Sequence, residues 1–449
     1  MKRRTLLTAT AASAAAASLA ACGSGTPGES KDDAAEADGR TPIEFWHRTF
    51  TPFENEWYAG IVSSYNDAQE KFFVKDVEVP ADAWDQRVKS AQAAGTMPDV
   101  YTDPSTMDEG ARLGQFLALD DLLDAEQLEN LTDQAKELVT VDGKVYGYPL
   151  LLEPQSALFW NKDMFEAAGL DPEKPPTSWD ELYATCEKLL PTLPDGAFAL
   201  TTAGDQDTFA WATVGQQFQV AGHFPITDDW SEADAEDAQY EELLGFYKTL
   251  REKGYIPKQP LGAYVEAKAY GEQKCAMMTS GSWAFSEIAS DYDDLLGVTG
   301  IAPFPTSDGD LSASVATLGN FKWVIDAKTD QPDGAADFLS WCLAGDVANL
   351  VPFFVGTQFT KAPARPDVAD AVQAAPEAAD APWSAVVSED IAPASVPTPS
   401  YPWDILLAMG KALEKGMNGE DPAKALSGAN GEIQKVIDRE ELAGKAPRD

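Results

Sequence analysis

Apolar positions along the chain follow two periods, one typical of strands and one typical of helices. "TPIEFW", from residue 41, and "VKDVEV", from residue 74, are short extended runs, and between them Trp57, Ile61 and Tyr65 repeat at helical spacing. A helical pattern over "WDQRVKSAQAAG" ends at Gly95, and "PDVYT" predicts a third strand. Strands that alternate with helices predict an α/β domain with a largely parallel sheet.

The run "KVYGYPLLLEPQSALFWN", from residue 144, has a different pattern. It is rich in aromatic and branched residues and is interrupted by Pro149 and Pro154, so it predicts a long extended segment rather than a helix. Such a segment would cross from one α/β lobe to another, and "APFPTSDGD", from residue 302, is a second candidate crossing. We therefore predict a first lobe of residues 41–152 and 305–358 and a second lobe of residues 153–304 and 359–449.

The second half of the chain continues the alternation. Ser178 and Glu181 predict a capping box at a helix start, and a helix with a clean apolar stripe ends at Gly254. "KCAMMTSGSW", "VTGIAPFP" and "NFKWVID" are predicted strands. The chain ends in helices, "DILLAMGKALEKGM" and a last one that begins at Asp421 and Pro422.

Composition and charge narrow the possible partners. A chain of 449 residues is long enough for two or more domains. Its net charge of −41 opposes contact with nucleic acid, so no nucleic-acid partner is expected. Cys186, Cys275 and Cys342 lie in apolar patterns and are predicted to be small core residues. With two histidines and no CxxC pair, we expect neither a metal site nor a cofactor.

The N-terminus is typical of an export signal. "MKRR" precedes a short, small-residue apolar stretch that is too weak for a lasting transmembrane helix. "LAAC" resembles the bacterial lipoprotein signal, which implies removal of residues 1–21 and acylation of Cys22, with residues 22–40 as a flexible tether. An ordinary cleavage site with an incidental cysteine is the alternative, and Arg3 with Arg4 leaves the general and twin-arginine export routes open. We expect the protein on the outer face of the cell membrane.

Sequence signatures of the common enzyme classes are missing. No GxGxxG, GxxxxGK[ST], HExxH or GxSxG motif occurs, and His47 and His223 are the only imidazoles for a catalytic triad. A pair of carboxylates for glycoside hydrolysis is conceivable, but 74 acidic residues make any chosen pair uninformative. We therefore predict a protein that is not an enzyme.

Several blocks together resemble a known family. "VDGKVYGYPLLLEPQSALFWNKDMFEAAGLDPEKPPTSWDEL", "AMMTSGSWAFSEI" and "YPWDILLAMGKALEKGMNGEDPAKAL" occur in the order seen in extracellular solute-binding proteins of ATP-driven sugar importers, the group typified by maltose-binding protein. The resemblance implies an α/β fold of two lobes, a carbohydrate held in the cleft by hinge closure, and delivery to a membrane permease without catalysis. We expect the chain to act as a monomer.

The same resemblance marks residues that would hold a sugar. Aromatic rings can stack on the apolar faces of sugar rings, and Trp283, Trp403 and Trp211 match aromatic positions of the family. Each has core packing as its alternative. The small residues before Trp283 would let a ligand approach the backbone.

Polar candidates come from the hinge run and from strand ends. Glu153 lies among apolar residues, where a carboxylate needs a partner, either a sugar hydroxyl or hinge backbone. Asp103, His47 and Arg48 lie at the carboxyl ends of predicted strands, where open α/β sheets bind ligands, and Asn320 is a weaker candidate. A turn-forming role for Asp103 and a core role for His47 are the alternatives.

Two other functions stay open at this point. The same fold could bind a different solute, such as iron or a polyamine, although the chain has no pair of adjacent tyrosines for iron. A secreted glycosidase is the remaining alternative, and the missing motifs count against it.

Overall fold

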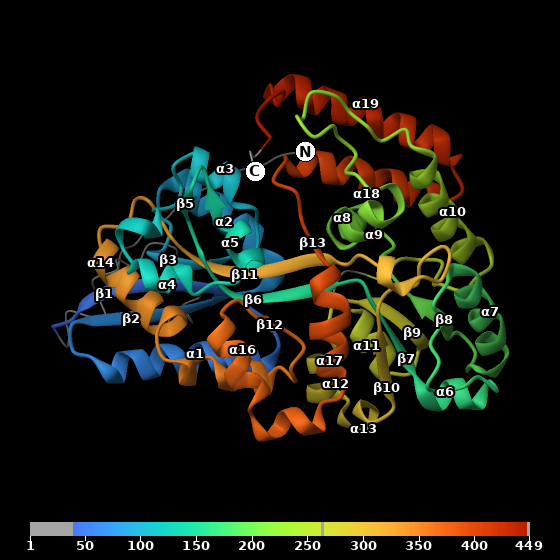
Figure 1. Cartoon of the computed structure of the whole chain (residues 1–449), viewed down its shortest axis with the longest axis horizontal. Coiled ribbons are helices and arrows are strands. Elements are labelled where there is room, and N and C mark those ends of the chain that lie inside the picture. The colour runs from blue at the N-terminus through green and yellow to red at the C-terminus, as the bar shows by residue number, and fades with distance from the viewer. Residues whose placement is uncertain (1–38, 262–264, 447–449) are drawn as a thin grey trace, which may run out of the picture.

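The chain folds into two lobes that lie side by side (Figure 1). The structure, a computed structural model, describes residues 39–261 and 265–446. Each lobe is built around its own sheet, and strands β6 and β11 run along the middle of the molecule toward the junction between the lobes (Figure 1). The predicted α/β fold with two lobes is confirmed.

The first lobe surrounds a seven-stranded sheet, counted over the described residues, with the order β12-β6-β11-β3-β1-β2 and with β13 paired to β11. Its strands are β1 (Thr41–Arg48), β2 (Phe72–Val79), β3 (Val100–Asp103), β6 (Tyr148–Gln155), β11 (Thr317–Ile325), β12 (Ala362–Pro363) and β13 (Val396–Pro397). Its helices are α1 (Pro52–Ala68), α2 (Trp84–Ala94), α3 (Met107–Arg112), α4 (Ala125–Glu129), α5 (Asp133–Glu137), α14 (Pro332–Leu339), α15 (Val351–Gly356) and α16 (Pro366–Gln373). A small hairpin, β4 (Thr140–Val141) with β5 (Lys144–Val145), lies beside this sheet.

The second lobe surrounds a four-stranded sheet, again within the described chain, with the order β10-β7-β9-β8. Its strands are β7 (Ala157–Asn161), β8 (Phe198–Thr201), β9 (Cys275–Ser280) and β10 (Thr299–Ala302). Its helices are α6 (Lys162–Ala167), α7 (Trp179–Leu189), α8 (Gln206–Ala212), α9 (Val214–Ala221), α10 (Ala238–Glu252), α11 (Glu266–Gly271), α12 (Ala284–Asp291), α13 (Asp293–Leu296), α17 (Trp383–Ala385), α18 (Trp403–Met417) and α19 (Pro422–Glu440).

The expectation of a largely parallel sheet is only partly right. β1 pairs in parallel with β2 and β3, as βαβ units require, but β11 is antiparallel to both β3 and β6. In the second lobe, β8 and β9 are parallel whereas β7 is antiparallel to β9 and β10. The strands that break the pattern are those that connect the lobes, because a chain that returns from the other lobe enters its sheet from the opposite end.

The apolar cores correct two of the predicted lobe boundaries. Residues 359–381 were predicted in the second lobe, yet Phe359 and Val368 pack in the core of the first lobe, and β12 pairs with β6. Residues 305–316 were predicted in the first lobe, yet Ala316 packs in a core of the second lobe and Thr306 bridges to Ser178. Neither segment carries a clear hydrophobic period, so the pattern of apolar positions could not show to which lobe each segment belongs.

Local signals place most helix ends where they were predicted. The apolar stripe of α10 ends before Gly254, whose φ is 72°, and α19 starts at Pro422 with Asp421 as its N-cap. At α7 the predicted capping box is half formed. Ser178 Oγ accepts from the amide of Glu181, whereas the Glu181 carboxylate accepts from the amide of Thr177.

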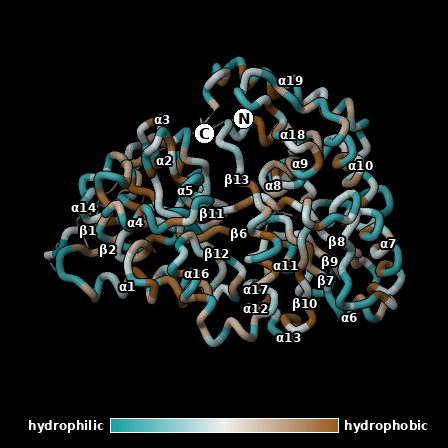
Figure 2. Tube along the Cα trace, viewed as in Figure 1, coloured by the Kyte–Doolittle hydropathy of each residue, from teal (hydrophilic) through white to brown (hydrophobic). Residues whose placement is uncertain are grey.

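The interior is apolar and the cysteines belong to it. β6 is buried along almost its whole length and runs as a hydrophobic strand through the middle of the molecule (Figure 2). Cys186, Cys275 and Cys342 are buried free thiols, as predicted, and burial raises the pKa of Cys275 to about 12. In the described part of the chain, no single helix has the length and apolar character needed to cross a membrane.

Candidate functional site

A pocket lies where β6 passes from the first lobe into the second. Gln155 and Ser156 form its wall at this crossing, and Trp211 of α8 and Trp283 in the turn before α12 form its aromatic side. Its cavity volume is about 20 Å³, and the pocket opens to solvent on one side. Two of the predicted site residues, Trp211 and Trp283, are therefore brought together.

The two tryptophans form one aromatic surface. Their ring centroids are 6.3 Å apart and the ring planes are inclined by 40°. Trp283 lies over Gly281, because a Cβ atom placed on that glycine would stand 1.7 Å from the ring. We expected Gly281 to open the backbone to a ligand, but the glycine makes room for the tryptophan ring itself.

Two pairs of polar side chains in this pocket are hydrogen-bonded to one another. The Tyr247 hydroxyl donates to Gln216 Oε1 over 2.5 Å, and the Thr279 hydroxyl donates to Thr202 Oγ1 over 2.7 Å. Gln155 Oε1 is buried and has no hydrogen-bond partner in the described part of the chain. A buried acceptor without a donor is unfavourable, so this oxygen is suited to a hydroxyl group of a ligand.

Charge in the pocket is negative. Glu266 lines it and is 8% exposed, and none of its described lining residues is Lys, Arg or His. An anionic ligand would therefore lie beside this carboxylate and beside no basic side chain of the described lining.

Glu153 has the partner that a buried carboxylate needs. It is 5% exposed, and its Oε2 lies 2.5 Å from Lys361 Nζ. Glu54 Oε1 lies 3.3 Å from the same nitrogen, so one lysine sits between two carboxylates. Burial alone would lower the pKa of Lys361, but the carboxylates of Glu153 and Glu54 outweigh it and raise that pKa.

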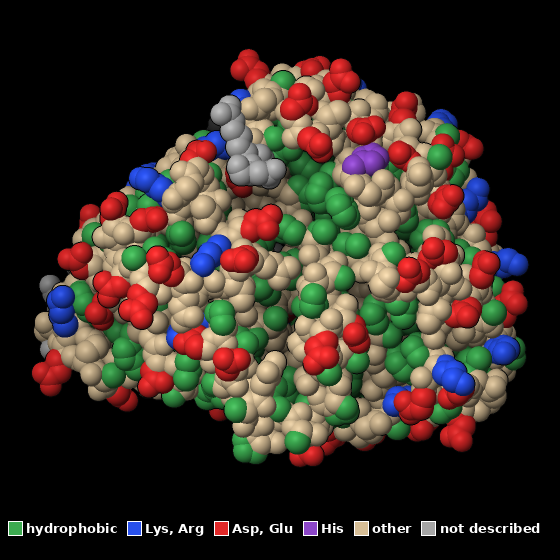
Figure 3. Space-filling view, in the orientation of Figure 1, with side chains coloured by type: hydrophobic (Ala, Val, Ile, Leu, Met, Phe, Trp, Pro, Cys, Tyr) green, Lys and Arg blue, Asp and Glu red, His purple; other side chains and the backbone are tan. Residues whose placement is uncertain are grey.

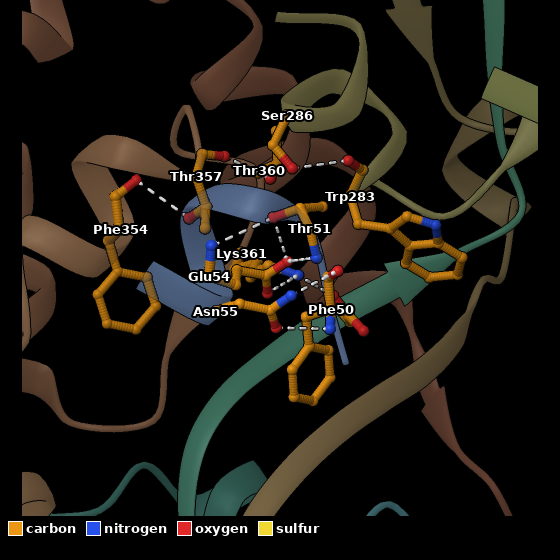
Figure 4. A network of polar contacts seen from close by, with 11 residues as sticks. Phe50, Thr51, Glu54, Asn55, Trp283, Ser286, Phe354, Thr357, Thr360 and Lys361 are labelled. Carbon is orange, nitrogen blue, oxygen red and sulfur yellow. Dashed lines mark hydrogen bonds and ion pairs between the residues drawn. The ribbon is translucent and has the colours of Figure 1, made fainter. Parts of the chain in front are cut away.

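Helix α1 supplies the other half of this ion network. Glu54 is the third residue of the helix, and its Oε2 accepts from the amide and hydroxyl of Thr51, the N-cap residue, at 3.2 and 2.7 Å. Figure 4 shows Thr51, Glu54 and Lys361 converging, with Trp283 and Ser286 beside them. The hydrogen bonds and ion pairs of this network join Thr51, Glu54, Glu153 and Lys361, all in the first lobe.

His47 lies inside the first lobe. It is 1% exposed, its ring stacks on Tyr58 with centroids 4.4 Å apart, and its Nε2 lies 3.3 Å from Asp76 Oδ1. The neighbouring Arg48 places its guanidinium over the rings of Phe50 and Phe321, at 5.6 Å from each centroid.

Asp103 and Asn320 surround a buried lysine. Asp103 Oδ1 accepts from the amide of Ser105 at 2.6 Å, which forms the turn after β3, and Lys322 pairs with Asp103 across the sheet. Lys322 Nζ donates to Asn320 Oδ1 over 2.9 Å and to the carbonyl of Ser105. Burial lowers the pKa of Lys322 to about 8, against the opposing effect of Asp103.

Trp403 stands apart from the pocket. It opens α18 and is 46% exposed, an unusual position for so large an apolar side chain. Ser400 lies close enough to α3 of the first lobe for its hydroxyl to hydrogen-bond the carboxylate of Asp108, so this segment lies where the lobes face each other. Figure 3 shows hydrophobic side chains gathered in a hollow between the lobes, below α19, while acidic side chains are spread over the visible surface.

Sequence reasoning missed Gln155, Lys361 and Lys322. Gln155 was within reach, because it is a polar residue in the same apolar run that drew attention to Glu153. The two lysines gave no signal, since a lysine in sequence is ordinarily a surface residue. Cys22 lies outside the described residues. Across residues 39–261 and 265–446, no group of three or more His, Cys, Asp or Glu side chains could hold a metal ion.

Comparison with known proteins identifies a matching family and several relatives. The family model described as "Bacterial extracellular solute-binding protein" matches residues 60–381. The chain is 27% identical over 202 residues to the sn-glycerol-3-phosphate-binding periplasmic protein of Yersinia pestis, which covers 42% of this chain. It is 27% identical over 278 residues to the maltodextrin-binding protein of Bacillus subtilis, which covers 59% of this chain. The chain spans 43% and 60% of the lengths of these two relatives.

Solved structures resemble the whole described fold. The GacH receptor of Streptomyces glaucescens, studied unliganded and with acarbose, superposes with a TM-score of 0.75 at 20% identity, over 89% of this chain and 99% of that receptor. At this identity the likeness shows the shared two-lobed fold.

Proposed function

Because this chain belongs to the bacterial extracellular solute-binding protein family, we propose that it captures a carbohydrate between its two lobes and delivers it to an ABC permease. The ligand is a neutral sugar, an oligosaccharide in the first instance. The paired rings of Trp211 and Trp283 at a pocket with a free acceptor carry this proposal.

Sugar chemistry matches this pocket in two respects. The C–H faces of a pyranose are apolar and stack on indole rings, which Trp211 and Trp283 offer. Sugar hydroxyls donate hydrogen bonds, and Gln155 Oε1 is a buried acceptor with a vacant position in the described chain.

Charge argues for a neutral ligand. The relatives are named for two different solutes, one a phosphate ester and one a maltodextrin. A phosphate group needs cationic or backbone donors, and the described lining of the pocket holds Glu266 and no basic residue. A neutral sugar fits this lining better than sn-glycerol 3-phosphate does.

The opposing wall of the site belongs to the first lobe. Arg48 and Asp103 lie at the ends of β1 and β3, and Asn320 lies on β11, so closure of the lobes would bring them toward the sugar. Trp403 serves as an outer stacking surface for a longer chain of sugar units. His47 and Glu153 hold the wall in place through their own protein partners, Asp76 and Lys361.

The lobes and the location of the protein complete the proposal. We assign residues 41–155 and 317–381 to the first lobe. We assign to the second lobe residues 157–316 and 383–394 and the C-terminal helices that begin at Trp403. The leader directs export, and acylation of Cys22 anchors a monomeric binding protein, without catalytic activity, to the outer face of the cell membrane near its permease.

A thermal-shift screen tests this function. A panel of neutral mono- and oligosaccharides is compared with sn-glycerol 3-phosphate, ferric citrate and spermidine. A rise in melting temperature with one class of neutral sugar is expected, since a ligand that binds only the native state stabilises it. A rise with the phosphate ester, iron or polyamine, and none with any sugar, would overturn the proposal.

A further inference from the structure

A single carbonyl oxygen joins the two strands that cross between the lobes. Ala212 is the last residue of α8, so its carbonyl has no partner within the helix. The Ser156 hydroxyl donates to this oxygen, and the Thr317 hydroxyl donates to it over 3.3 Å. Ser156 follows β6 directly and Thr317 begins β11, so each donor stands at a crossing.

The backbone at Ser156 is in an unusual conformation. Its φ is 73°, in the left-handed region that a residue with a side chain rarely adopts, and it is 6% exposed. It lies between β6 of the first sheet and β7 of the second, where the chain changes lobes. Such a conformation persists when its surroundings hold it, and the hydroxyl bond to Ala212 is one of those restraints.

Thr317 is held from a second side. Its hydroxyl also accepts from the amide of Gly215 at 2.9 Å, and it is fully buried. A Cβ atom on Gly215 would stand 2.3 Å from the carbonyl carbon of Ala316, so only glycine lets α9 approach the crossing this closely. Thr317 and Gln155 pair across the sheet, which places the two crossings next to each other.

Each tryptophan of the pocket is next in sequence to a residue that is hydrogen-bonded at a crossing. Trp211 precedes Ala212, and Trp283 follows Ser282, whose amide donates to the carbonyl of Pro154 over 2.9 Å. The aromatic surface of the pocket is therefore fixed to the strands that connect the lobes.

We propose that Ser156 and Thr317 form a clamp on the Ala212 carbonyl that positions Trp211 and couples ligand contact at this ring to both crossing strands. The clamp deepens the proposed function, and the part of this proposal that concerns the ligand rests on that function. A ligand that stacks on Trp211 contacts the end of α8. A shift of this helix end is transmitted through the two hydroxyl hydrogen bonds to the crossing strands about which the lobes move. Ser156 and Thr317 are positioning residues, since they act through Trp211.

Matched substitutions at Thr317 test the clamp. Thr317→Val keeps the shape and removes the hydroxyl, whereas Thr317→Ser keeps the hydroxyl. Amide hydrogen exchange is measured on the full chain without ligand. The valine variant is expected to exchange roughly tenfold faster over residues 213–217 and also over residues 155–158 on the other crossing, while the serine variant matches the wild type.

Exchange at the distant crossing separates a clamp from a local cap. Faster exchange confined to residues 213–217, or equal effects of Val and Ser, would overturn the proposal. If Thr317→Val does not fold, Ser156→Ala is read in the same way, with faster exchange expected over residues 315–319. No change there would overturn the proposal.

A ligand arm keeps the two proposals distinguishable. With the panel sugar that gives the largest thermal shift, Thr317→Val is expected to bind roughly three- to tenfold more weakly, and Thr317→Ser within about twofold of wild type. A wild-type protein that binds no sugar would overturn the proposed function, while the exchange data would still decide the clamp. Unchanged sugar affinity in Thr317→Val would overturn the proposed coupling between ligand contact at Trp211 and the crossing strands.

Discussion

The rings of Trp211 and Trp283 face each other across 6.3 Å although they belong to segments far apart in the chain. Trp211 is the last residue but one of α8, and Trp283 directly precedes α12. Their neighbours Ala212 and Ser282 are hydrogen-bonded to Ser156 and Pro154 at the crossing of the lobes. Two indole rings held in this way offer an apolar wall to a planar or ring-shaped ligand.

Removal of one ring should weaken sugar binding without unfolding the protein. Trp283→Ala is expected to lower affinity for the preferred sugar by about tenfold or more, because a stacked aromatic residue at the centre of a site carries much of the binding energy. Tryptophan fluorescence titration measures the affinity, and urea denaturation checks stability.

Trp403→Ala is the matched control. The ring is 46% exposed and lies outside the pocket, so binding of a disaccharide should stay within about twofold of wild type. Equal losses in the two variants for a disaccharide would contradict the assignment of the pocket as the inner site.

The buried ion network should be essential for stability. Lys361→Met leaves the carboxylates of Glu153 and Glu54 buried without a cation, so we expect about 3–5 kcal/mol less free energy of unfolding. Urea denaturation gives this value. Lys89→Met, on the exposed face of α2, should change it by less than about 0.5 kcal/mol. A loss below about 1 kcal/mol in Lys361→Met would show that the network is dispensable.

Lys322 should give stability a rising dependence on pH. Its pKa is lowered to about 8 in the folded protein by burial, so above pH 8 the unfolded chain binds more protons than the native one and stability increases with pH. The expected gain from this group between pH 8 and 9.5 is about 1.5 kcal/mol. The buried thiols of Cys186, Cys275 and Cys342, whose pKa values burial raises, act in the opposite direction in both proteins. Urea denaturation across that range should therefore show wild type gaining about 1.5 kcal/mol relative to Lys322→Met. If the free energy of unfolding changes with pH equally in both proteins, Lys322 is not the group responsible for the pH dependence.

Membrane anchoring should depend on Cys22. In a bacterial host that processes lipoproteins, wild-type protein is expected in the membrane fraction and Cys22→Ala in the soluble fraction, because the acyl chains provide the anchor. Cys275→Ala, which changes a buried thiol, should remain with the membrane. Membrane retention of Cys22→Ala would show that another feature of the chain binds the membrane.

Sequence periodicity predicted the individual elements better than their arrangement. The alternation of apolar positions located β1, α1, β2 and α2, since local spacing decides which face of an element is buried. Strand direction in β11 and the lobe assignment of residues 359–381 depend on how the chain returns from the other lobe. That information is contained in tertiary packing and not in local spacing.

In the candidate site, too, local sequence context revealed single residues but not their partners in the fold. An aromatic residue next to small residues pointed to Trp283, and a carboxylate in an apolar run pointed to Glu153, because each type is conspicuous in its local context. The partner of Glu153 was beyond sequence reasoning, since Lys361 lies 208 positions away and reaches it through the fold.

The most direct test of the central claim is an equilibrium titration of the intrinsic tryptophan fluorescence with neutral oligosaccharides and, separately, with sn-glycerol 3-phosphate. The account predicts a saturable change with at least one neutral oligosaccharide, a change that is weakened in Trp283→Ala, and none with the phosphate ester. Saturable binding of sn-glycerol 3-phosphate with no response to any neutral sugar would contradict it.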